Sequence, residues 1–293
     1  MVKKLGRSFK YVYLALMLFF LYVPIIYLIV FSFNDFTVGK RISYANLGNW
    51  KGFTLHNYMT LFTGEAGQSL LLTLEVAGIT SVAATLIGTA AAIGIYAMKK
   101  RTRNVVLNIS QLPMVNPDLV TGITFMMLFA FVNGLLAELG ARQVGDFAKL
   151  LIAHISFSIP YVIFSVMPRL RQSSDLLYEA AMDLGCSPMR ALWKAVIPDI
   201  LPGITSGFVM ALTMSLDDFV VSYFVSDLRS VLSVYIYSAA RGARGVNPAL
   251  ATVIFVPLVS LLLIVNFRRL AKEHEYEIQS KKVKLKDKGG NVA

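Results

Sequence analysis

Residues 169–202 read RLRQSSDLLYEAAMDLGCSPMRALWKAVIPDILP, and this stretch decides how the rest of the sequence is interpreted. It is too long for a simple turn between two apolar segments, and its pattern predicts two short helices. The first helix is expected to begin near Ser174 or Asp175, because both residue types are good N-caps. It is expected to end at Gly185, since glycine readily adopts the left-handed conformation that follows a helix.

The second short helix is expected to start at Ser187 and Pro188, a suitable N-cap followed by a first-turn proline. We expect Pro198 and Pro202 to close it before the next apolar segment. A compact helix–glycine–helix structure at a membrane surface is typical of a docking device. A surface helical hairpin without a partner is the alternative that the pattern alone leaves open.

The composition on either side of this stretch indicates a membrane protein. Of the 293 residues, 56% are hydrophobic and only 15% are charged, whereas soluble domains carry about a quarter charged residues. The apolar residues are also gathered in long blocks. Cys186 is the single cysteine, which excludes an internal disulfide and a metal site built from several cysteines. These features exclude a soluble enzyme and a disulfide-stabilised scaffold.

Six segments are long and apolar enough to cross a bilayer, whose core of about 30 Å needs about 20 residues of helix. The first follows a basic N-terminus but is too long for the core of a signal peptide, so we interpret it as a retained anchor. Ala84, Gly88 and Ala92 recur every four residues, which favours close helix packing in lipid. The predicted spans are 11–33, 70–98, 105–132, 147–167, 203–225 and 249–267.

Basic residues set the expected orientation, because cytoplasmic loops are enriched in lysine and arginine. With both termini in the cytoplasm, most of the 28 basic residues fall on the cytoplasmic side, including those of the basic tail 268–293. Topology therefore explains the net charge of +11, and we expect no nucleic-acid partner. The sequence predicts an all-α polytopic membrane protein with six transmembrane helices, in which residues 1–293 form a single domain with cytoplasmic N- and C-termini.

Two strings resemble those of ABC-importer permeases. Residues 179–185 read EAAMDLG and are followed by Ile197-Pro198, which resembles the cytoplasmic EAA loop of that superfamily; Ile197 stands where the pattern often has leucine. Residues 215–219 read SLDDF, which resembles the permeases of spermidine/putrescine importers. The order and spacing of such strings are similar to those permeases over nearly the whole chain.

This resemblance implies the fold of a type I (MetI-like) importer permease in the plasma membrane of a prokaryote. It implies ATP-driven uptake of polyamines with a second homologous permease, an ABC ATPase dimer and an extracytoplasmic polyamine-binding protein. ATP and magnesium would bind to the ATPase, so this chain needs no cofactor and is not an enzyme; its sequence contains no phosphate-binding GxxxxGK[ST] loop. By analogy, the residues that couple to the ATPase are Glu179, Ala180, Ala181, Asp183, Gly185 and Pro198.

Four acidic residues lie within the predicted spans, namely Glu75, Asp118, Asp217 and Asp218. An ionised carboxylate in hydrocarbon costs at least about 2.5 kcal/mol, so such residues usually face a cavity. An acid-lined route suits a small polycation. We therefore expect these four residues to line the substrate path and to bind successive ammonium groups.

Each acid also has a simpler explanation. Asp118 follows Pro117 and suits the cap of a helix that restarts after a break. Asp217 and Asp218 point about 100° apart on a helix, so one of them faces a cavity while the other can bond a neighbouring helix. Glu75 lies close enough to the membrane interface to be hydrated.

The remaining polar features give weaker indications. His154 lacks a second metal ligand at a useful spacing, so we expect a core histidine with satisfied hydrogen bonds, and neither a metal site nor a catalytic site. The outer segment 34–69 is amphipathic and suits either a seat for a binding protein or interfacial anchoring. Two functional alternatives stay open: the same architecture carrying another small cation or iron, and a proton-coupled secondary transporter, which has no use for a cytoplasmic docking structure.

Overall fold

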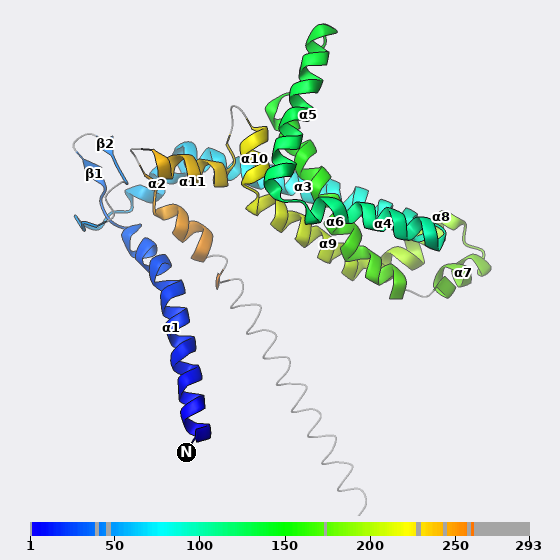
Figure 1. Ribbon diagram of the computed structural model, residues 1–293, viewed down its shortest axis with the longest axis horizontal. Helices are drawn as coiled ribbons and strands as arrows, with labels where there is room; N and C mark the ends of the chain where they lie inside the picture. The colour runs from blue at the N-terminus through cyan, green and yellow to red at the C-terminus, as the bar shows by residue number, and fades with distance from the viewer. Residues whose placement is uncertain are drawn as a thin grey trace, which may run out of the picture. The chain divides into compact units, whose positions relative to one another are not determined.

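The computed structural model describes residues 2–38, 41–44, 48–172, 175–226, 230–242, 245–256 and 259–260 (Figure 1). The chain divides into two compact units, residues 1–62 with 242–293 and residues 63–241. Within the described residues the regular structure is helical apart from one pair of two-residue strands. Five of the described helices are long and apolar enough to cross a membrane, namely Tyr11–Phe31, Glu65–Tyr96, Asp118–Glu138, Asp146–Gln172 and Pro188–Asp217.

The first unit begins with the long apolar helix α1, Val2–Phe31. Strands β1, Thr37–Val38, and β2, Arg41–Ile42, pair antiparallel after it, and the short helix α2 spans His56–Thr63. Residues 249–256 and 259–260 are helical and belong to the predicted span 249–267. The rest of that span, and the basic tail 268–293, lie outside the described residues.

Buried amide side chains hold the first unit together. The Asn57 Nδ2 donates hydrogen bonds of 2.8 Å to the carbonyls of Ser32 and Asn34, which follow α1. The Asn247 Nδ2 donates a 2.9 Å bond to the carbonyl of Asn57. Since an unpaired buried carbonyl is costly, these bonds fix α2 between the end of α1 and the segment that precedes residues 249–256.

The second unit is built on three long helices that pack side by side, α3, α6 and α9 (Figure 1). Small residues allow their close approach: Ala84 and Ala92 are fully buried, as the four-residue repeat predicted. A β-carbon on Gly88 would lie only 2.7 Å from the β-carbon of Val162, so glycine is required there. Helices α3 and α6 span Glu65–Tyr96 and Asp146–Gln172, and α9 spans Ile197–Asp217.

The predicted span 105–132 is two helices in the structure. Helix α4, Lys100–Val115, lies along α6, and helix α5, Asp118–Glu138, follows after a break at Asn116 and Pro117. Asn116 is extended, with φ −66° and ψ 137°, because the ring of the following proline disfavours the helical conformation. Hydropathy alone did not reveal this break, although the proline indicated that a helix restarts at Asp118.

The predicted span 203–225 also differs from the structure. Helix α9 begins earlier, at Ile197, and ends at Asp217; the extended Asp218 then leads to the short helix α10, Val220–Val225. Figure 1 shows α5 beside α10, and the last helix of this unit, α11, Leu232–Arg241, packs on α3. The apolar run therefore contains a change of direction that its hydropathy conceals.

Candidate functional site

The predicted stop at Gly185 is present as a complete helix C-cap. Helix α7, Asp175–Asp183, is followed by Gly185 with φ +85°, a conformation that glycine adopts without steric cost. The Gly185 amide donates to the carbonyl of Met182 at 2.9 Å, and the Cys186 amide donates to that of Ala181 at 3.1 Å. This pair of bonds is a Schellman motif, which satisfies the last carbonyls of α7 and reverses the chain.

The restart at Ser187 and Pro188 is also confirmed. Helix α8, Pro188–Ala191, has Ser187 as its N-cap residue and proline in its first turn, and the Ala191 amide donates to the Ser187 carbonyl at 2.9 Å. The expectation that Pro198 and Pro202 close this helix was wrong. A π-helical turn, Leu192–Val196, continues into α9, and both prolines lie within α9. The wider turn relieves the clash that a proline ring makes with a preceding carbonyl.

We call residues 175–196 the coupling structure, because they contain five of the six residues that the EAA resemblance implies for coupling. Of those six, Glu179, Ala180, Asp183, Gly185 and Pro198 are exposed and Ala181 is half-buried. Large apolar side chains are exposed beside them, which sequence reasoning missed: Leu184 at 87%, Met189 at 64% and Trp193 at 63%. Exposed apolar side chains gathered in this way are typical of a protein–protein contact surface.

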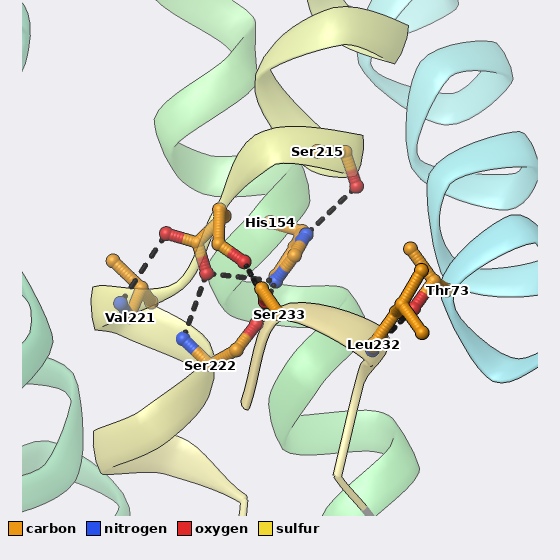
Figure 2. Close-up of polar contacts among 8 residues, drawn as sticks. Thr73, His154, Ser215, Val221, Ser222, Leu232 and Ser233 are labelled. Atoms are coloured by element: carbon orange, nitrogen blue, oxygen red, sulfur yellow. Dashed lines mark hydrogen bonds and ion pairs between the residues drawn. The ribbon is translucent and has the colours of Figure 1, made fainter. Parts of the chain in front are cut away.

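A buried polar cluster centres on His154 of α6 (Figure 2). Its imidazole is fully buried; Nδ1 lies 2.7 Å from the Ser215 hydroxyl oxygen of α9, and Nε2 lies 3.0 Å from that of Ser222 in α10. The same Nε2 lies 3.5 Å from Oδ2 of Asp218. The sequence-based expectation of a core histidine with hydrogen-bond partners is confirmed, and its partners join three helices.

Asp218 occupies the break between α9 and α10. Its Oδ1 accepts a 3.2 Å bond from the Val221 amide and its Oδ2 a 2.8 Å bond from the Ser222 amide, so the carboxylate caps the first turn of α10. The Ser233 hydroxyl of α11 donates a 2.7 Å bond to the Asp218 carbonyl. These contacts tie the carboxylate of Asp218 to α10 and its carbonyl to α11.

The three other predicted path acids, Asp217, Asp118 and Glu75, are exposed. Asp217 is the last residue of α9. Asp118 is the first residue of α5, and one turn later Gly122 packs on α10, because a β-carbon there would lie 3.3 Å from the Val220 carbonyl oxygen. Glu75 lies on α3 two residues after Thr73, whose hydroxyl accepts a 2.8 Å bond from the Leu232 amide of α11.

An aromatic cluster follows directly after the acid pair. The ring centroid of Phe219 lies 5.6 Å from that of Tyr223 and 4.9 Å from that of Tyr237 in α11. The Arg241 guanidinium lies over the Tyr237 ring at 4.6 Å, a cation–π contact. Sequence reasoning missed this cluster; its signals are the four-residue spacings from Phe219 to Tyr223 and from Tyr237 to Arg241.

In the first unit, the outer segment presents apolar side chains. Trp50, Phe53, Leu55 and Phe62 are exposed, whereas Leu61 is buried. In the same unit the Ser32 and Tyr58 hydroxyl oxygens lie 2.6 Å apart, and the rings of Phe33 and Phe53 stack with their centroids 5.4 Å apart. A rigid base with an exposed apolar surface agrees with either a partner contact or anchoring at the membrane interface.

Comparison with known proteins identifies related sequences over almost the full length. Residues 84–273 match the family model "Binding-protein-dependent transport system inner membrane component". The chain is 32% identical to the spermidine/putrescine transport system permease protein PotC of Shigella flexneri, covering 98% of this chain and 99% of that protein. It is also 32% identical to the putrescine transport system permease protein PotI of Escherichia coli (strain K12), covering 89% of this chain and 91% of that protein.

Among solved structures, the fold resembles a chain in the crystal structure of a bacterial ABC transporter involved in the import of the acidic polysaccharide alginate. The TM-score is 0.68 with 19% sequence identity, and the match covers 93% of this chain and 97% of the other. At this identity the match establishes the fold alone.

Proposed function

This chain belongs to the binding-protein-dependent transport system inner membrane components, and we propose that the cargo it conducts is a polyamine, spermidine or putrescine. Membership of the family makes it a multi-pass permease subunit of an ABC importer and not an enzyme. ATP hydrolysis belongs to a separate subunit, and a binding protein delivers the cargo.

One observation carries the mechanical part of the proposal. The continuous helical segment Pro188–Asp217 has the exposed coupling structure at one end and the exposed Asp217 carboxylate at the other. Its 30 residues correspond to about 45 Å at 1.5 Å per residue, enough to cross a bilayer. A movement of the ATPase against the coupling structure can therefore reach the cargo route through one rigid element.

The coupling structure is the docking surface for the ATPase dimer in this proposal. Leu184, Met189 and Trp193 supply the apolar contact, and Gly185 allows the reversal that brings α7 against α8. Glu179 and Asp183 add exposed carboxylates to this surface. Ala180, Ala181 and Pro198 are the other residues that we assign to the ATPase contact. ATP and magnesium are bound by the partner ATPase, and this chain carries no cofactor of its own.

Charge and aromatic character support a polyamine as the cargo. Asp217 is exposed and precedes Phe219 by two residues, and alkylammonium ions are attracted both by carboxylates and by aromatic faces. We assign Asp217, Asp118 and Glu75 to direct contact with ammonium groups. Asp218 instead holds the break between α9 and α10 in place, because its carboxylate is already bound by backbone amides and lies beside His154.

The proposed topology has six spans, including 249–267, with both termini in the cytoplasm of a prokaryotic cell. A second, homologous permease completes the route, and the outer segment 34–69 helps to seat a polyamine-binding protein. The helical segment Pro188–Asp217 would then carry the coupling structure on the cytoplasmic side and Asp217 on the outer side. The positive-inside distribution of basic residues supports this orientation.

The test is uptake of labelled spermidine and putrescine by cells that lack this chain and every other polyamine importer. Wild-type chain should restore uptake, and the Gly185→Glu variant should insert in the membrane without restoring it. Unchanged uptake in the deleted cells would reassign the cargo while leaving the permease architecture in place. Uptake that continues without an ATPase subunit would contradict the proposed mechanism and favour a secondary transporter.

A further inference from the structure

A polar cavity of about 570 Å³ lies between α4 and α6. Its polar lining consists of amides and one guanidinium, from Asn104, Asn108, Gln111, Arg171 and Gln172. Figure 1 shows α4 at the same end of the helical bundle as α7 and α8, which is the cytoplasmic end in the proposed topology. None of these residues has a part in docking the ATPase or in the acid contacts described above.

The amides of α4 form a stripe of their own. Asn104, Asn108 and Gln111 follow at spacings of four and three residues, so they lie on one face of the helix. Leu107 is buried on the same side of the helix and also lines the cavity. Another face carries the exposed apolar side chains Val105, Ile109 and Leu112.

This division of α4 indicates what the amide stripe faces. Amides that face hydrocarbon are costly because lipid offers them no hydrogen bonds. Helix α4 already has an apolar exposed face for lipid or a packed neighbour. The stripe therefore borders a water-filled space, to which the cavity belongs.

We propose that the amide stripe, Asn104, Asn108 and Gln111, is the exit half of the cation route and binds ammonium groups through neutral amide oxygens. This assignment rests on the proposed polyamine function. An ammonium group is attracted to a carboxylate by a full opposite charge, whereas a neutral amide oxygen offers it only a dipole. A cargo that passes from Asp217 and Asp118 to the stripe moves from charged to neutral acceptors, so its binding weakens toward the cytoplasm.

Arg171, in the last turn of α6, also lines the cavity and completes this gradient. Its guanidinium is always charged and repels a polycation that would re-enter from the cytoplasm. The route thus begins with carboxylates, continues with amides and ends beside a positive charge. Such an order favours release over retention.

The experiment converts one neutral acceptor of the stripe to a charged one with little change of shape. The complete transporter, with its binding protein, is reconstituted in vesicles with Asn108→Asp, and with Gln111→Glu as the second position. Thr102→Asp adds the same charge on an exposed part of α4 that does not line the cavity.

A carboxylate in the exit half should retain the cargo and lower the maximal rate of spermidine uptake about fivefold. This fall corresponds to an increase of slightly less than tenfold in the affinity of the exit half for the cargo. Putrescine uptake should fall less, because putrescine carries two ammonium groups and spermidine has three amino groups. Thr102→Asp should stay close to the wild-type rate. The ratio of the two uptake rates separates retention from a general loss of folded protein.

Wild-type spermidine rates in both Asn108→Asp and Gln111→Glu would overturn the assignment, while polyamine uptake by the wild-type chain would still support the proposed function. An equal loss in Thr102→Asp would also overturn it, since charge within the cavity would then not be the cause. Failure of the wild-type chain to transport either polyamine would overturn the proposed cargo and this assignment together.

Discussion

The His154 Nε2 lies 3.5 Å from Oδ2 of Asp218, and the pair joins α6 to the break between α9 and α10. The imidazole is fully buried, and the carboxylate also accepts the first amides of α10. The pair therefore holds the point at which α9 ends and the chain changes direction. The two neighbouring aspartates therefore have different roles, because Asp217 is exposed while the Asp218 carboxylate is held by the amides of α10 and lies beside His154.

Removal of the imidazole should destabilise the protein. His154→Leu leaves the hydroxyls of Ser215 and Ser222 without their buried imidazole partner, and each such loss costs about 1–3 kcal/mol. We expect a clearly lower midpoint of thermal unfolding in detergent. His154→Gln, which keeps an amide near one partner, should lie between the two; a His154→Leu protein as stable as wild type would show that the cluster has no structural role.

The two aspartates should respond differently to neutralisation. Asp217→Asn removes an exposed carboxylate from the route, so the KM for polyamine uptake should rise about five- to tenfold while thermal stability stays unchanged. Asp218→Asn should instead lower thermal stability, because the amide cannot accept both backbone hydrogen bonds of α10. Kinetics of uptake and thermal unfolding of both variants check this; an equal response of the two residues would remove the distinction.

Gly185 should tolerate only residues that adopt the left-handed conformation. At φ +85°, alanine costs about 1–2 kcal/mol and asparagine less. We expect Gly185→Ala to reduce ATP-coupled uptake, Gly185→Asn to reduce it less, and Gly185→Glu to abolish it with normal membrane insertion. Quantification of the inserted protein is the control, and full uptake with Gly185→Glu would contradict the docking role of the coupling structure.

The exposed apolar surface of the coupling structure should determine assembly with the ATPase. Leu184→Ser together with Met189→Ser should weaken co-purification of the ATPase without lowering the thermal stability of the isolated chain, since both side chains are exposed there. Lys194→Ser, an exposed change in the same structure, is the matched control. Retention of the ATPase by the double variant would place the docking surface elsewhere.

Local signals were sufficient to predict the coupling structure. Gly185 as a stop and Ser187-Pro188 as a restart depend on backbone preferences of single residues, and both are present as expected. The small residues Ala84 and Ala92 likewise indicated a closely packed helix. The prolines were misinterpreted, because a π-helical turn accommodates Pro198 and the helix continues.

The interior of the candidate site depends on contacts that the sequence pattern does not contain. His154 is separated by 61 residues from Ser215 and by 68 from Ser222, so its partners follow only from the packing of α6 against α9 and α10. Hydropathy could not locate the break at Asp218, since apolar residues continue on both sides of it. The aromatic cluster was missed for the same reason, because Tyr237 reaches Phe219 from another helix.

The most direct test of a polyamine importer driven through the coupling structure is accumulation of labelled spermidine in vesicles that contain the complete transporter. The loaded binding protein is supplied on the outer side and ATP on the ATPase side. We predict accumulation with the wild-type chain and ATP, and none either without ATP or with Gly185→Glu. Accumulation that persists without ATP, or that is unaffected by Gly185→Glu, would contradict the account.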